Sequence, residues 1–282
     1  MNTGHTTDVA VSLCWGTVMR AGLTELADHA GRAGFDAVSI TPAMYADAVA
    51  SGLSGAEMRR QLADAGVAVS LIDPLMSALP GSPDPATAGG RFGALFSYGE
   101  DDCYRIAEAL DVPAINVAHY MGESVPVARL VDGFGALCER AGAHGLRVLL
   151  EFMPEGSVPD LAAALAIVRA TGAVNVAVMF DTWHFFRTGG TLADLEGLAP
   201  GEVGGVQVSD AHAAQHGVIA ARVNSRLLPG AGSIPIAAVI DRVLRGASDP
   251  FIGIEVFSDA LNELPIGEAV AQARDSMKEV MA

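Results

Sequence analysis

The 282-residue chain is long enough for one large domain or two small ones, and its 51% hydrophobic content is ample for a sizeable core. Its formal net charge of -16 repels polyanions, which argues against non-specific binding to nucleic acid or to an anionic membrane surface. A small-molecule substrate fits this charge better.

The amino-terminal segment lacks a basic region followed by an apolar stretch and a cleavage site, and no apolar run approaches the length of a membrane span. The three cysteines, Cys14, Cys103 and Cys138, have unrelated spacings, which argues against a disulfide framework and against a zinc knuckle. We therefore expect ordinary thiols in the reducing cytoplasm.

Short apolar runs, mostly β-branched, recur along the chain and are typical of buried strands. In chain order they are Asp8 to Leu13, Ala37 to Ile40, Ala68 to Ile72, Ala114 to Ala118, Arg147 to Phe152, Val176 to Phe180, Gly204 to Val208 and Phe251 to Phe257. Segments with helical periodicity lie between them, and one opens with the capping-box pair Ser54 and Glu57. Strand and helix therefore alternate throughout.

Eight such units in about this length predict an α/β fold, a (β/α)₈ TIM barrel, in a single domain over residues 1–282. An open doubly wound sheet is the alternative. Against it, the sequence has no G-x-G-x-x-G after the first strand and no G-x-x-x-x-G-K-[ST], so neither phosphate-binding fingerprint is present.

A long stretch without clear periodicity runs from Asp73 to about Gly99 and is rich in Pro, Gly and Ser. Because it follows the third predicted strand, the barrel places it on the catalytic face, where we expect it to act as a lid. A shorter excursion, residues 211–233, follows the seventh strand on the same face.

Three widely separated apolar segments end in a carboxylate, at Glu151, Asp181 and Glu255, and a fourth carries Gln207. An ionised carboxylate at the end of a buried strand is costly unless a cation offsets its charge. Since the carboxyl ends of barrel strands surround one mouth, these four residues predict a metal site. Each carboxylate could instead cap a helix or lie in a solvated loop, and Gln207 could be an ordinary interior amide.

Four oxygen donors favour a hard divalent ion such as Mn²⁺ or Mg²⁺. Zn²⁺ or Co²⁺ is the alternative, because His184 or His212 could join the coordination sphere.

Further side chains near the predicted mouth are candidates for substrate binding: His184, Arg226, His119, Trp15 and Trp183. The guanidinium of Arg226 could hold a carboxylate or polarise a carbonyl oxygen, or it could pair with a neighbouring acid. The two tryptophans could form apolar pocket walls or belong to the core.

Several motifs from about Asn116 onward resemble the xylose isomerase-like TIM barrels, which include sugar epimerases, inosose isomerases and dehydratases, 3-dehydroshikimate dehydratases and endonuclease IV. They are LLEF with Glu151, FDTWHF with Asp181 and His184, VQVSD with Gln207, RLLPGAGSI with Arg226, and IGIEVF with Glu255. The endonuclease IV branch fits poorly, because it requires more metal-binding histidines and a basic groove.

The resemblance implies that Glu151, Asp181 and Glu255 bind the metal and that the two glutamates exchange protons with the substrate. In the family, the position of Gln207 is more often histidine, so the resemblance leaves the metal's identity open. It also implies that His184 and Arg226 line the substrate site.

A metal that chelates a carbonyl and the adjacent hydroxyl acidifies the neighbouring proton and stabilises the ene-diolate that forms when a carboxylate removes it. We therefore expect an isomerase or epimerase acting on a keto-sugar, a cyclitol or a similar polyhydroxylated carbonyl compound. One alternative is a dehydratase (lyase) of an inosose or 3-dehydroshikimate-like ring, and another is a non-catalytic metal-binding subunit. The protein could also form a homo-oligomer, because barrels of this family often associate.

Overall fold

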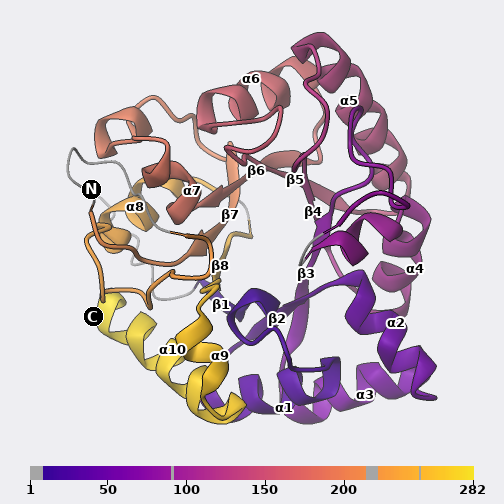
Figure 1. Ribbon diagram of the computed structural model, residues 1–282, viewed down its shortest axis with the longest axis vertical. Coiled ribbons are helices and arrows are strands. Elements are labelled where there is room, and N and C mark those ends of the chain that lie inside the picture. The colour runs from indigo at the N-terminus through magenta and orange to yellow at the C-terminus, as the bar shows by residue number, and fades with distance from the viewer. Residues whose placement is uncertain (1–8, 90–91, 214–221, 248) are drawn as a thin grey trace.

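The computed structural model describes residues 9–89, 92–213, 222–247 and 249–282. Eight parallel strands form a closed barrel in chain order, and the helices surround it (Figure 1). The predicted TIM barrel is thus confirmed, and the open sheet is excluded. The strands are β1 (Ala10–Leu13), β2 (Ala37–Ile40), β3 (Ala68–Leu75), β4 (Ala114–Ala118), β5 (Arg147–Glu151), β6 (Val176–Asp181), β7 (Val203–Val208) and β8 (Phe251–Ile254).

In the described part of the chain, the connecting segments contain α-helices and short 3₁₀ helices. The α-helices are α1 (Leu23–Ala33), α2 (Pro42–Ala50), α3 (Gly55–Ala65), α4 (Glu100–Leu110), α5 (Val127–Ala143), α6 (Leu161–Thr171), α7 (Thr182–Arg187), α8 (Ile236–Val243), α9 (Asp259–Glu263) and α10 (Ile266–Met281), and the 3₁₀ helices are η2 (Trp15–Thr17), η3 (Gly93–Ser97) and η4 (Leu192–Leu195). Helix α3 begins at the predicted capping box, in which Ser54 and Glu57 each accept a hydrogen bond from the other's backbone N–H.

Two strand ends differ from their predicted positions by more than one residue. Strand β3 continues to Leu75, so Asp73 belongs to the strand and does not begin a loop. Strand β8 ends at Ile254, so Glu255 is the first residue beyond it. Asp8, the predicted start of the first strand, lies outside the described residues.

The barrel interior consists of an apolar layer below a polar one. The apolar layer contains Leu71, Ala114, Leu149, Ala177, Met179 and Phe251. Side chains two positions apart on a strand point to the same side of the sheet, so Asp73, Asn116, Glu151 and Asp181 project inward one layer higher, at the carboxyl ends. The strand period itself therefore places these polar side chains together.

The larger hydrophobic core lies between the barrel and its helices, and Gly31 marks a place where two helices pack tightly. Helix α1 packs beside α3, and a Cβ at Gly31 would overlap the carbonyl oxygen of Ala65. Gly135 in α5 is also helical, but a Cβ there would be 3.8 Å from Thr171, an ordinary contact.

We therefore expect Gly31→Ala to destabilise the protein by about 1–3 kcal/mol, because a backbone atom must move. Gly135→Ala should stabilise it by up to about 1 kcal/mol through helix propensity. Urea unfolding of the two variants measures both effects, and a stabilising Gly31→Ala would contradict the tight packing of α1 on α3.

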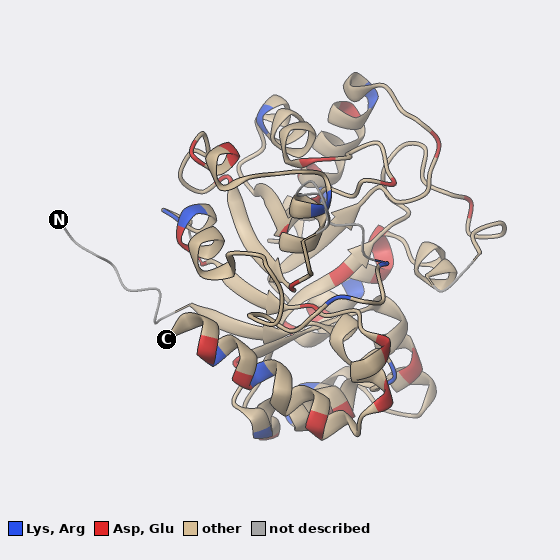
Figure 2. Cartoon of the chain, turned by 60° about the vertical axis from the view of Figure 1, so that its left-hand side comes forward, with Lys and Arg blue, Asp and Glu red and all other residues tan. Residues whose placement is uncertain are grey.

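The acidic residues behind the net charge are spread over the outer helices together with fewer Lys and Arg residues (Figure 2). Among the described residues, no helix combines the length and the apolarity needed to cross a membrane.

Candidate active site

A cavity opens at the carboxyl ends of the strands. Its empty volume is about 560 Å³, including the open solvent at its mouth. One wall is aromatic: the ring of Trp15 makes edge-to-face contacts with Phe92 and Phe257, with centroids 6.2 and 5.5 Å apart. Phe92 and Leu95 belong to the segment that the sequence predicts to be a lid, and both line the cavity. Residues 90–91 of that segment lie outside the described part, and its closure remains a prediction.

Of the three predicted carboxylates, Glu151 and Glu255 line this cavity, and Asp181 pairs with Arg226, which also lines it. Glu151 ends β5, Asp181 ends β6 and Glu255 follows β8, and each is at most 4% exposed. Glu151, Asp181 and His184 each offer a ligand atom, and these atoms lie within 4.8 Å of one another.

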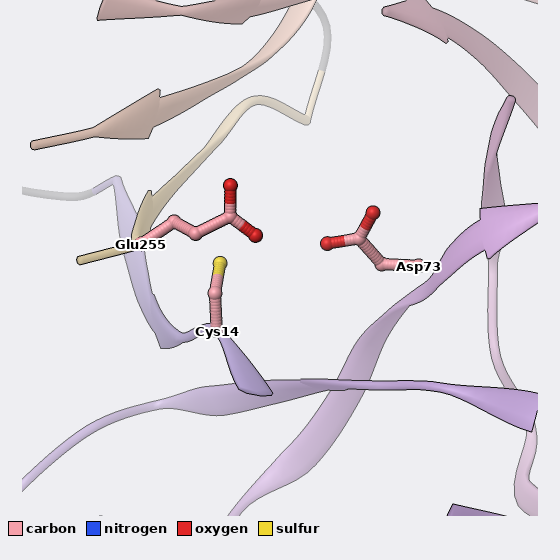
Figure 3. A group of neighbouring side chains, drawn as sticks. All are labelled: Cys14, Asp73 and Glu255. Atoms are coloured by element: carbon pink, nitrogen blue, oxygen red, sulfur yellow. The ribbon is translucent and has the colours of Figure 1, made fainter. Parts of the chain in front are cut away.

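A fourth carboxylate, not predicted from the sequence, is that of Asp73 on β3, which is 2% exposed and lines the same cavity. Ligand atoms of Asp73, Glu255 and Cys14 lie within 4.8 Å of one another, and Figure 3 shows the two carboxylates pointing toward each other with the thiol beside Glu255. All three cysteines are buried and free, as expected, but Cys14 belongs to the site. Burial and the charge of Glu255 raise the pKa of this thiol well above its usual value.

Two interior amides connect these acids. Asn116 Nδ2 donates to Asp73 Oδ1 at 2.7 Å and to Glu151 Oε2 at 2.6 Å. Gln207 Nε2 donates to Asp73 Oδ2 at 3.0 Å. The side-chain oxygens of both amides are buried without a hydrogen-bond partner among the described residues.

Arg226 is the buried cation of the site. Its Nη1 donates to Asp181 Oδ2 at 2.7 Å and lies 3.6 Å from Glu255 Oε2. The guanidinium carbon lies over the rings of Trp183 and Phe257, 4.6 and 5.0 Å from their centroids. From the sequence, Arg226 could contact a substrate or pair with a neighbouring acid. In the structure it forms the ion pair with Asp181 and also lines the cavity.

His184 lies in α7, whose first turn is held by Asp181. Asp181 Oδ1 accepts the backbone N–H groups of Trp183 and His184 at 2.6 and 3.1 Å, so this acid both caps the helix and faces the site. His184 Nε2 lies 3.7 Å from Glu151 Oε1 and 3.8 Å from Asp181 Oδ2. Burial lowers the pKa of His184 to about 4 despite the opposing charge of Asp181, so the imidazole is neutral at neutral pH.

The electrostatics of the site disfavour the ionised form of several of its carboxylates. Four buried carboxylates, those of Asp73, Glu151, Asp181 and Glu255, face one buried guanidinium. Burial, followed by the charge of Asp73, raises the pKa of both Glu151 and Glu255 well above the usual value, and burial raises that of Asp73 to about 6. Burial also acts to raise the pKa of Asp181, but Arg226 outweighs it and the pKa is lowered.

This donor set fits a divalent cation. The oxygens of Glu151, Asp181 and Glu255, together with the unpartnered oxygen of Gln207, are ligands of the kind that hard cations prefer. A cation among them would offset the excess negative charge and satisfy the amide oxygen.

The mouth of the cavity carries polar groups that the sequence analysis missed. Glu155 and Arg187 line it and form an ion pair with each other, and the Arg187 guanidinium lies 4.7 Å from the centroid of the Trp183 ring. Glu155 lies in the loop after β5, and Arg187 is the last residue of α7, so neither residue directly ends a predicted strand. Trp15 and Trp183 are buried and line the cavity, and Trp183 is also part of the main hydrophobic core.

His119 is the one proposed substrate contact that the structure does not bring to the cavity. It is fully buried beyond β4, its Nδ1 accepts the backbone N–H of Ser157 at 3.0 Å, and it packs against Gly122 and Gly156. His212 is exposed in its loop. Residues 214–221 of the predicted excursion lie outside the described part of the chain.

A family model described as "Xylose isomerase-like TIM barrel" matches residues 27–280. An inosose isomerase of Halalkalibacterium halodurans is 26% identical over 183 residues, which cover 62% of this chain and 64% of that protein. The match therefore spans less than two thirds of the relative's length.

Two solved structures share the fold. The IOLI protein, crystallised with a binding zinc atom, superposes with a TM-score of 0.82 at 17% identity over 96% of this chain and 98% of its own. The probable 3-DHS dehydratase AsbF of Bacillus anthracis superposes with a TM-score of 0.72 at 15% identity over 95% of this chain and 98% of its own.

Proposed function

Because the chain belongs to the xylose isomerase-like TIM barrel family, we propose that it is a divalent-metal-dependent isomerase or epimerase of a keto-sugar, cyclitol or related polyhydroxylated carbonyl compound. The observation that carries this proposal is the set of four buried carboxylates around one guanidinium, beside an unpartnered amide oxygen. The inosose isomerase relative supports the substrate class.

Glu151, Asp181, Gln207 and Glu255 would hold the cation. Their donors are all oxygens, which favours Mn²⁺ or Mg²⁺, while the proximity of His184 keeps Zn²⁺ or Co²⁺ possible. When bound, the ion polarises the substrate carbonyl and stabilises the ene-diolate that follows proton removal.

Glu151 and Glu255 are the acid and base of this proposal. Both line the cavity, and burial raises the pKa of each, which brings a carboxyl closer to the range in which it can both accept and return a proton near neutral pH. Arg226 and the neutral His184 lie beside them and orient the substrate's oxygens. The aromatic wall of Trp15, Phe92 and Phe257 would limit the access of water to the site.

The test is an NMR assay of inososes, ketoses and 3-dehydroshikimate with metal-stripped protein and with protein reloaded with Mn²⁺. Interconversion of two isomers that depends on Mn²⁺ supports the proposal. Loss of water to give a conjugated product, seen as new ultraviolet absorbance, would instead establish the dehydratase that the AsbF-like fold also accommodates. Metal binding without turnover of any compound would favour the non-catalytic subunit.

Metal affinity should depend on pH. In the metal-free protein, burial raises the pKa of Glu151 and Glu255, so protons compete with the cation for these two ligands as the pH falls. We expect apparent Mn²⁺ affinity to fall by about tenfold or more between pH 7 and pH 5. Calorimetry in two buffers of different ionisation enthalpy counts the released protons, and an affinity that is constant from pH 5 to 7 would contradict the metal site.

A further inference from the structure

Asp73 receives hydrogen bonds from two amides that reach it from different strands. It lies on β3, Asn116 on β4 and Gln207 on β7, and all three are at most 2% exposed. The donors are Asn116 Nδ2 and Gln207 Nε2, at 2.7 and 3.0 Å from the two oxygens of the Asp73 carboxylate. Each oxygen of Asp73 therefore has its own amide partner.

This pairing fixes the rotation of the Gln207 amide. The hydrogen bond runs from the Gln207 N–H₂ group to Asp73, so the Gln207 oxygen is turned away from that carboxylate. That oxygen is buried without a partner among the described residues, an arrangement that costs about 1–3 kcal/mol when nothing else binds it. Gln207 is in register with Asp181 on β6, so both side chains lie on the same side of the sheet, facing the barrel interior.

We propose that Asp73 is a positioning residue: by holding the Gln207 amide nitrogen, it directs the Gln207 oxygen to the cation. The inference rests on the proposed metal-dependent function and goes beyond it, because it assigns a task to a carboxylate outside the proposed ligand set. Asn116 extends the same arrangement, since its second N–H donates to Glu151 at 2.6 Å.

The substitution Asp73→Asn separates this role from the general need for negative charge. The new amide keeps the size of Asp73, and its oxygen can still accept from Asn116, which preserves the bond between Asn116 and Glu151. Its nitrogen then faces Gln207, so the Gln207 amide must rotate and point its own nitrogen at the cation. Mn²⁺ affinity should fall by about 10-fold to 100-fold, as when a supporting partner of a ligand is lost.

A double-mutant cycle tests the inference through Mn²⁺ affinity measured by calorimetry, with thermal unfolding of each metal-free variant to confirm folding. Asp73→Asn should weaken binding strongly in the wild-type background but by no more than about threefold in the Gln207→Ala background, because its effect passes through Gln207. Equal losses in both backgrounds would overturn the inference, since Asp73 would then act by charge alone or as a ligand.

A rescue variant provides a second test. Asp73→Asn combined with Gln207→Glu keeps the number of carboxylates and restores a donor facing an acceptor, so it should recover affinity to within about threefold of wild type. Affinity as weak as that of Asp73→Asn alone would overturn the inference. If the wild type failed to bind Mn²⁺, the proposed function would fail as well, whereas wild-type binding with an unaffected Asp73→Asn would overturn the inference alone.

Discussion

Replacing Glu255 by Gln is expected to lower the rate of metal-dependent proton exchange by about 100-fold to 10,000-fold at saturating Mn²⁺. Glu255 is 4% exposed, lines the cavity and lies near Arg226 and Asp73, so it faces the place where a substrate carbonyl would bind. An amide keeps the shape and one oxygen donor but cannot accept the substrate's proton.

Glu263→Gln is the matched control, because Glu263 is an exposed residue at the end of α9 and undergoes the same chemical change. Its exchange rate should equal that of the wild type. Full activity in Glu255→Gln with Mn²⁺ bound would remove Glu255 from proton transfer and would favour a role in binding alone.

Removing the buried guanidinium should have the largest effect on stability. Arg226→Met leaves Asp181 and its neighbouring acids without a cation, and breaking one side of a buried ion pair costs about 3–5 kcal/mol. We expect this loss in urea unfolding of the metal-free variant. Added Mn²⁺ should recover part of it, because a bound cation offsets the same carboxylates and stabilises the folded state by mass action.

Arg140→Met provides the comparison for this measurement. Arg140 pairs with Glu100 at 2.7 Å, but its side chain is 51% exposed, so its removal should cost no more than about 1 kcal/mol. Equal losses for the two variants would contradict the view that Arg226 compensates a buried excess of negative charge.

The barrel and three of its site carboxylates could be predicted because the signals are local. Apolar runs alternate with helical periodicity, and a carboxylate that ends such a run must lie at the mouth when all the strands are parallel. Glu151, Asp181 and Glu255 followed from this rule. Asp73 obeys the same rule, since it follows the run from Ala68 to Ile72, but Pro74 and the irregular segment after it made it look like the start of a loop.

The remaining features depend on contacts across the barrel. Asn116 is a single polar residue inside a strand and carries no periodic signal, yet it joins Asp73 to Glu151. His119 stands at a strand end like the carboxylates, but the adjoining loop covers it and Ser157 binds its ring. Asp210 lies three residues after Gln207, but its carboxylate accepts the backbone N–H groups of Gly230, Gly232 and Ile234. It therefore stabilises the loop that precedes α8. The contacts of these three side chains depend on strand register and loop packing, which no local sequence pattern reveals.

The central claim is that a bound divalent cation and the buried glutamates remove a proton next to a substrate carbonyl. Solvent-deuterium incorporation into inososes and ketoses, followed by NMR with metal-stripped and with Mn²⁺-loaded protein, tests it most directly. The account predicts incorporation at a carbon adjacent to the carbonyl only in the loaded sample, at a rate strongly reduced in Glu255→Gln. Exchange at the same rate in the stripped protein, or a protein that binds no metal after Mn²⁺ loading, would contradict it.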